Sequence, residues 1–160
     1  MMSLVFGLTC GQSNKQSIDK STLVGSWKSS IHFQTGSLAS IKDLEFMYAF
    51  NPGGTMTESS NYDAAPPVPP AYGIWKSSGS NQYEARYEFY ITRTPTPAEA
   101  ATASGGWLPG GHGLLFETIT IANDGNSFSS KIRYDVFDQT GKPSVGGGTG
   151  TAQAARMIFK

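Results

Sequence analysis

The chain of 160 residues has the length of one domain, which is enough to bury a core without the help of disulfides. Its 12 lysines and arginines balance its 12 aspartates and glutamates, and a formal net charge of zero argues against nucleic acid as a partner. A low charged fraction of 15% and 19 glycines are typical of many short strands joined by turns. A single cysteine excludes an intramolecular disulfide, and with only two histidines the composition argues against a zinc site.

Residues 1–22 precede the first predicted strand and are expected to lie outside the folded domain. Met1 to Thr9 is apolar, is too short to cross a bilayer and lacks the basic start of a complete signal peptide. Two interpretations are open: a loosely packed N-terminal arm, or the remnant of an export signal in which Cys10 would carry a lipid. The compartment is accordingly either the cytoplasm or the outside of the membrane, and no membrane-spanning segment is expected.

The folded domain is predicted over residues 23–160, where apolar and polar residues alternate between clusters of turn residues. This period of two is the signature of half-buried antiparallel strands, and no helical period is sustained. The alternation is clearest on the face that carries Tyr83, Ala85, Tyr87, Phe89 and Ile91. In chain order, strands are predicted at 23–33, 44–50, 55–60, 72–77, 82–92, 114–121, 128–136 and 151–159.

The connections between these strands alternate in length. The short ones are 51–54, 78–81 and 122–126, and the long ones are 34–43, 61–71, 93–113 and 139–150. In an up-and-down meander every second connection lies at the same end, so this alternation predicts a closed base and a loop-lined mouth. The predicted fold is all-β: an eight-stranded antiparallel up-and-down β-barrel, which either holds one small ligand or is filled by its own side chains.

The start of the first strand, Gly25-Ser26-Trp27, resembles the Gly-x-Trp motif of the lipocalins, and fatty-acid-binding proteins and avidins have similar entries. In those barrels the tryptophan closes the base, and an arginine near the last strand covers its ring. The resemblance therefore implies a structural base made of Gly25, Trp27 and Arg156, with a cation–π pair between the last two. The chain has no Thr-Asp-Tyr motif, and Lys28-Ser29 replaces the Asn-Asp of avidins, so biotin is not expected. The resemblance implies a divergent bacterial lipocalin-like barrel, and such scaffolds bind hydrophobic molecules.

Three tyrosines, Tyr48, Tyr87 and Tyr134, fall on predicted inward faces at the middle of the barrel. A buried hydroxyl group needs a hydrogen-bond partner, so these side chains are expected either to bind a ligand or to pair with one another. Phe89 shares the inward face of Tyr87 and belongs to the same predicted binding set.

The predicted strand at 114–121 has two interpretations. If Leu115 points inward, Glu117 does too, and a carboxyl group in an apolar cup has a raised pKa and can act as a general acid or base. If Phe116 points inward instead, Glu117 is an ordinary surface residue. Glu58, on the face shared with Met56 and near the mouth, is a second candidate of the same kind and ranks below Glu117.

Two long connections are expected to shape the mouth. The segment 93–113 contains a predicted helical turn at 97–102 and then Trp107 between pairs of glycines. It is either a lid over the mouth or a surface loop. The proline-rich segment 61–70 is expected to form a stiff wall.

Two functions are consistent with these features. The first is a carrier or binding protein for a small hydrophobic molecule, held by Tyr48, Tyr87, Phe89, Tyr134 and Trp107. The alternative is a cofactor-free isomerase or cyclase in which Glu117 and Tyr87 are catalytic. The sequence has no Ser-His-Asp set, phosphate-binding glycine loop or nucleotide fingerprint, which excludes hydrolases, kinases and dehydrogenases, and no cofactor or metal is expected. An ionisable group with a shifted pKa inside the cavity would distinguish the two functions.

Overall fold

The computed structural model describes residues 22–62, 68–102 and 106–159. The predicted N-terminal arm, with Cys10, lies almost wholly outside the described residues. The elements are β1 (Gly25–Phe33), β2 (Leu44–Phe50), β3 (Thr55–Ser60), β4 (Ala71–Ser77), β5 (Gln82–Arg93), α1 (Pro97–Ala100), β6 (Leu108–Ile121), β7 (Ser127–Phe137) and β8 (Pro143–Arg156).

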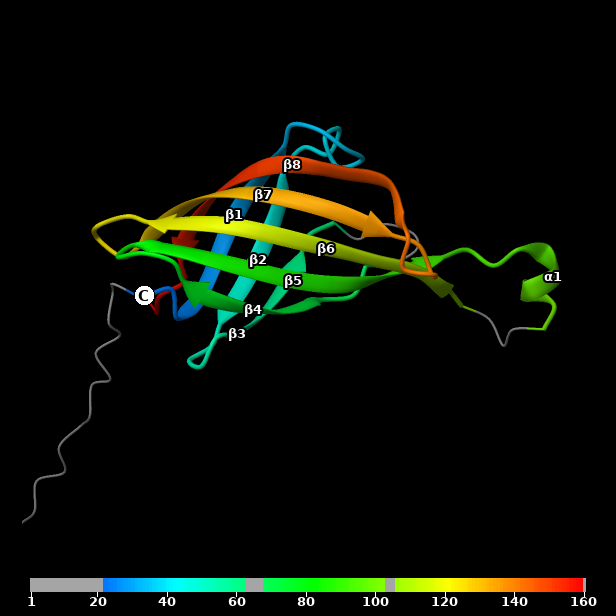
Figure 1. The fold of residues 1–160 in the computed structure, drawn as a ribbon, viewed down its shortest axis with the longest axis horizontal. Coiled ribbons are helices and arrows are strands. Elements are labelled where there is room, and N and C mark those ends of the chain that lie inside the picture. Colours follow the sequence, from blue (N-terminus) through cyan, green and yellow to red (C-terminus); the bar gives the residue numbers. More distant parts are fainter. Residues whose placement is uncertain (1–21, 63–67, 103–105, 160) are drawn as a thin grey trace, which may run out of the picture.

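The strands form one closed barrel in chain order, and every neighbouring pair is antiparallel (Figure 1). β1 closes the barrel by pairing with both β2 and β8, so that Trp27 lies opposite Tyr48 on one side and Arg156 on the other. A closed barrel has no unpaired strand edge at which another chain could add a strand. The predicted all-β, eight-stranded, up-and-down barrel is confirmed.

Alternate residues along each strand point into the barrel, as the period of two predicts. In β1 the buried residues Trp27, Ser29, Ile31 and Phe33 alternate with exposed ones. Toward the base, the interior is filled by large aromatic side chains, among them Trp27, Phe50 and Phe128. Their removal from water stabilises the fold. Room for a ligand is therefore confined to the part of the barrel nearer the mouth.

The connections divide between the two ends of the barrel. The base has the short turns at 51–54, 78–81 and 122–126, and the mouth has the connections at 34–43, 61–70, 94–107 and 138–142. Three of the mouth connections are long, as predicted. The predicted length of the fourth was wrong, because residues 143–150 belong to β8 and leave only a tight turn, closed by a 2.9 Å hydrogen bond from Asp138 N to Lys142 O.

Glycine explains why the start of β8 was predicted as a loop. Residues 143–150 are glycine-rich, and glycine is generally depleted in strands. Here the segment pairs with β7, with Gly148 opposite Tyr134. A Cβ atom at Gly148 would lie 2.0 Å from the carbonyl oxygen of Thr35, so glycine allows two backbones to approach closely. β8 also ends earlier than predicted, because residues 157–159 follow it as an exposed tail.

β5 and β6 continue beyond the barrel as a projecting hairpin (Figure 1). β6 begins at Leu108 rather than at residue 114, and it pairs with β5 as far as Arg93. The predicted helical turn is present as α1, which Thr96 caps, and Arg93 forms a 2.6 Å ion pair with Glu99 in that turn. No helix within the described part of the chain has the length and apolar character needed to cross a membrane.

Candidate functional site

A cavity of about 200 Å³ lies at the mouth end of the barrel. Its apolar lining includes Leu38, Leu44, Phe46, Phe89, Ile91 and Leu115. Its polar lining consists of Ser37, Ser60, Tyr62, Tyr134 and Glu58. An apolar protein cavity of about 150 Å³ holds one benzene ring, so this cavity has room for a single ring with a short substituent.

One wall of the cavity is an aromatic pair from two strands that are not neighbours. Phe89 on β5 and Tyr134 on β7 stack with ring centroids 6.0 Å apart and an interplanar angle of 18°. Burial, followed by the nearby Tyr62, raises the pKa of Tyr134 to about 12, so its hydroxyl group stays protonated at neutral pH. The pair offers a flat apolar surface with one hydroxyl group to a ligand ring. The proline-rich connection adds Val68 and Pro69 to the cavity lining, and residues 63–67 of the predicted wall lie outside the described residues.

Among the described residues of the cavity lining, Glu58 on β3 is the one with a carboxyl group. It lies opposite Tyr48 on β2 and Ala71 on β4, and its residue is only 6% exposed. Its Oε1 atom is buried without a hydrogen-bond partner. Burial, and then the charge of Glu117, raises the pKa of Glu58 to about 8. A buried polar atom without a partner costs free energy, and a ligand group that hydrogen-bonds to it recovers that cost.

A second buried carboxyl group, Glu117 on β6, lies one inward position closer to the base than Leu115. Its residue is 2% exposed. The Tyr87 hydroxyl group donates to Glu117 Oε2 at 2.9 Å, and the Ser130 hydroxyl group donates to Oε1. Burial raises the pKa of Glu117, against the opposing effect of these hydrogen bonds. The interpretation with Leu115 and Glu117 inward is confirmed, although Glu117 does not line the cavity itself.

Tyr48 belongs, with Glu117, Tyr87 and Ser130, to a cluster of polar side chains below the cavity. Its ring packs edge-on against that of Tyr87, with centroids 6.1 Å apart, but the Tyr87 hydroxyl group donates to Glu117. The Tyr48 hydroxyl oxygen is buried without a hydrogen bond of ordinary geometry. Burial, followed by the charge of Glu117, raises the pKa of Tyr48 far above its usual range, and the hydroxyl groups of Tyr87 and Ser29 act in the opposite direction. Two unpartnered polar atoms, Glu58 Oε1 and this hydroxyl, thus lie on facing residues of β2 and β3.

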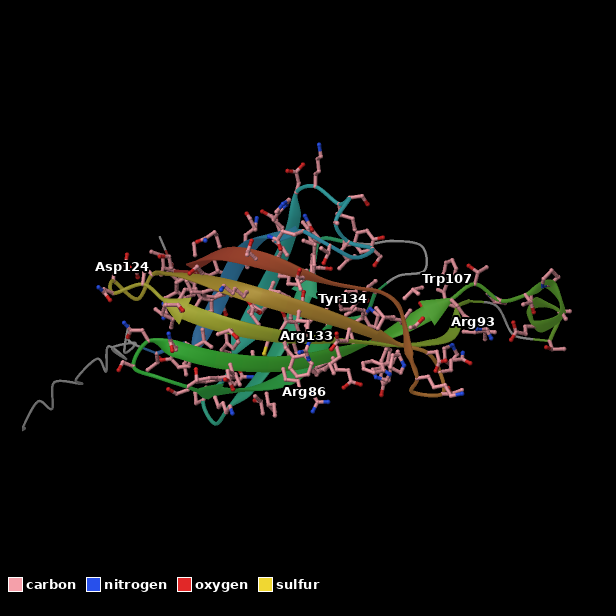
Figure 2. The ribbon with its side chains drawn as sticks, turned by 45° about the horizontal axis from the view of Figure 1, so that its top comes forward. Arg86, Arg93, Trp107, Asp124, Arg133 and Tyr134 are labelled. Carbon is pink, nitrogen blue, oxygen red and sulfur yellow. The ribbon has the colours of Figure 1, made fainter. Side chains whose placement is uncertain are left out.

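The predicted binding residues therefore separate into three places. Phe89 and Tyr134 line the cavity, whereas Tyr48 and Tyr87 lie below it. Trp107 is 42% exposed and does not line the cavity; Figure 2 shows it beside Arg93 on the projecting hairpin, away from Tyr134. The structure does not bring Trp107 to the other residues of the predicted set.

Sequence reasoning did not identify Ser130 as part of the polar cluster below the cavity. The signal was the alternation of β7, in which Phe128, Ser130, Ile132 and Tyr134 share the inward face. A serine on an otherwise apolar inward face indicates a buried polar partner, which here is Glu117.

The base has the arrangement that the resemblance implies. The Arg156 guanidinium lies 4.2 Å from the centre of the Trp27 ring, and the Trp27 indole donates to Leu23 O at 2.9 Å. Gly25 has a φ of +132°, and a Cβ atom there would lie 2.8 Å from Arg156 Nη1. The glycine of the motif is therefore required both for its backbone conformation and for the space that the arginine occupies.

Comparison with protein families and with curated sequences identifies no relative. No protein-family model matches the chain, and no curated protein sequence is significantly similar to it. Within residues 22–62, 68–102 and 106–159, no cluster of three or more histidine, cysteine, aspartate or glutamate side chains is arranged to hold a metal ion.

Proposed function

We propose that this barrel binds a small, mainly apolar molecule in the cavity at its mouth, with Glu58 as the polar group that orients it. The observation that carries the proposal is the unpartnered, buried carboxyl oxygen of Glu58 in a mainly apolar lining. Ligand sites typically combine apolar walls with a few polar groups in this way. A barrel built only for stability would gain by placing an apolar side chain at this position.

The size of the cavity restricts the ligand further. At about 200 Å³ it lies below the usual range for drug-sized ligands, which is roughly 300–1,000 Å³. Long acyl chains and polycyclic pigments do not fit in this volume. The Phe89–Tyr134 pair supplies a surface on which a single aromatic ring can stack.

We also propose that the chain is a divergent lipocalin-like barrel. The closed eight-stranded meander, Gly25-Ser26-Trp27 at the start of β1, and Arg156 over the Trp27 ring support this relationship. Because a fold does not determine a function, this relationship does not by itself identify the ligand.

A cofactor-free isomerase or cyclase is the second candidate function, and Glu58 is the observation that favours it. A carboxyl group with a pKa of about 8 at the edge of an apolar cavity is suited to give and take a proton near neutral pH. Glu117, with Tyr87 and Ser130 as its donors, would then tune Glu58 rather than contact a substrate. In this version the catalytic carboxyl group is Glu58 and not Glu117.

The proposal is tested by titrating the protein with toluene, observed by NMR of the protein and by the shift in thermal unfolding. We expect saturable binding and chemical-shift changes at Phe89, Tyr134 and Leu115. Ile91→Trp, which fills the mouth of the cavity, should abolish binding. Ile74→Trp makes the same substitution on the exposed outer face of β4 and should leave binding unchanged. An unsaturable response, or equal effects of the two variants, would show that the barrel has no functional cavity.

A further inference from the structure

The charges inside the barrel are unbalanced. Glu58 and Glu117 both point inward, and the charge of Glu117 acts on Glu58. Among the described inward-facing residues, the one cationic side chain is Arg156, at the opposite end of the barrel. It is already bound there to the carbonyl oxygens of Gly125, Val24 and Thr22. The described lining of the cavity includes no lysine, arginine or histidine.

We propose that the ligand of this cavity is a small aryl-alkyl amine, whose ring lies against the Phe89–Tyr134 pair and whose ammonium group binds the carboxylate of Glu58. This inference rests on the proposed function, since it names the chemical class of the molecule that the cavity binds. An ammonium group supplies three hydrogen-bond donors and the positive charge that the interior lacks. It satisfies the Oε1 atom of Glu58, which the protein leaves unpartnered.

Glu117 discriminates between an amine and other polar groups. A negative charge below Glu58 disfavours a second carboxylate in the barrel and favours a cation in the cavity. A ligand carboxylate or phosphate would add a further negative charge near Glu117 and is disfavoured by the same reasoning. The aromatic rings of Phe46, Phe89 and Tyr134 in the lining further favour a cation near their faces.

The proton balance of binding is defined by two pKa values. Alkyl amines have a pKa of about 10, close to that of lysine. In the empty cavity Glu58 is protonated below about pH 8. Binding of the ammonium form then releases the Glu58 proton to solvent, and an ammonium–carboxylate pair remains in the cavity. The affinity for an amine should therefore rise about tenfold per pH unit up to about pH 8 and level off between pH 8 and the pKa of the amine.

Other titratable groups face Glu58 from the described elements around it. The facing titratable groups are Tyr48 on β2, Tyr87 on β5, Glu117 on β6, Tyr134 on β7, and Tyr62 on the mouth connection. The tyrosines with shifted pKa values, Tyr48, Tyr87 and Tyr134, are all shifted upward and stay neutral near pH 8. Glu117 is held by two donors and does not line the cavity. Glu58 is thus the group whose ionisation a ligand in the cavity senses directly.

The experiment compares three probes of matched size: 2-phenylethylamine, 2-phenylethanol and propylbenzene. Each is titrated by calorimetry or ligand-observed NMR at pH 6, 7, 8 and 9. At pH 8 we expect the amine to bind at least about tenfold more tightly than propylbenzene. Its affinity should rise from pH 6 to pH 8, whereas the affinity for the alcohol, which accepts a hydrogen bond from protonated Glu58, should fall over the same range.

Glu58→Gln preserves the shape of the side chain and removes its charge. We expect this variant to lose the preference for the amine and its pH dependence while it still binds propylbenzene. Glu84→Gln, on the exposed outer face of β5, is the matched control and should bind like the parent protein. Propylbenzene binding with equal or weaker binding of the amine would overturn the inference and leave the proposed function standing. No binding of any probe to the parent protein would overturn the proposed function itself.

Discussion

The Arg156 guanidinium lies over the Trp27 ring and also donates hydrogen bonds to three backbone carbonyl groups. Its Nε donates to Gly125 O at 2.8 Å, its Nη1 to Val24 O at 2.7 Å and its Nη2 to Thr22 O at 2.7 Å. One side chain from the end of β8 thus joins the β6–β7 turn to the segment that enters β1. Burial lowers the pKa of Arg156, but a guanidinium stays protonated throughout the accessible pH range.

Replacement of Arg156 by alanine should lower the free energy of unfolding by about 1–3 kcal/mol, because the cation–π contact, the packing of the side chain and the carbonyl partners are lost together. Denaturation with urea measures this change. The matched control is Arg133→Ala. Arg133 lies 4.2 Å from the centre of the Phe116 ring but is 57% exposed, on the outer wall where Figure 2 shows it with Arg86. The control should cost less than about 1 kcal/mol. Equal costs would show that the base plug has no special role.

The barrel itself could be predicted from the sequence because two independent patterns agree. The alternation within each strand indicates which residues point inward, and the alternation of connection lengths orders the strands into a meander. The pairing of Trp27 with Arg156 then joins the first strand of the barrel to the last. The extra lengths of β6 and β8 could not be predicted in this way. At Gly148 the glycine reflects the close approach of Thr35, and a single sequence does not distinguish such a glycine from one in a loop.

The site was predicted less completely than the fold. Both inward candidates, Glu58 and Glu117, were identified, but Glu117 was ranked first, whereas it is Glu58 that lines the cavity. Leu114 and Leu115 are both buried in the structure, so periodicity alone left the orientation of Glu117 open. Whether a carboxyl group reaches the cavity depends on the register between strands. That register places Glu58 opposite Tyr48, and pairing of this kind is not visible in the sequence of either strand.

The hydrogen bond from Tyr87 to Glu117 should contribute to stability. Tyr87→Phe removes a donor from a buried carboxyl group, and we expect a loss of about 1–3 kcal/mol in the free energy of unfolding. Tyr72→Phe makes the same change on the exposed face of β4 and should stay within about 0.5 kcal/mol of the parent protein. A neutral effect of Tyr87→Phe would mean that Ser130 alone satisfies Glu117.

The raised pKa of Glu58 predicts an unusual dependence of stability on pH. This carboxyl group titrates near pH 4.5 in the unfolded chain and near pH 8 in the folded one, so the folded state binds more protons between these values. Its contribution is therefore complete below about pH 4.5 and is lost as the pH rises toward 8, by at most about 1.4 kcal/mol per pH unit. Urea denaturation between pH 5 and pH 9 should show this decline in the parent protein.

Glu58→Gln separates this effect from the other titrating groups. Because glutamine does not ionise, the variant should lose part of the decline, and the difference in stability between variant and parent should change steadily from pH 5 to pH 8. Glu84→Gln should keep the slope of the parent protein, since Glu84 lies on the outer face of β5. Parallel curves for all three proteins would show that Glu58 has an ordinary pKa in the folded state.

The exposed position of Trp107 favours a surface loop over a lid for the long connection. Trp107 is exposed on the projecting hairpin and does not line the cavity, whereas Phe89 lines it and stacks on Tyr134. We therefore expect Trp107→Ala to change the dissociation constant of toluene by less than about twofold. Phe89→Ala removes a wall of the site and should weaken binding by about fivefold or more, since a loss of about 1 kcal/mol corresponds to that factor. Titration of both variants under the same conditions makes the comparison. If Trp107→Ala weakens binding as much as Phe89→Ala, the hairpin closes over the mouth when a ligand is bound, and the lid interpretation holds.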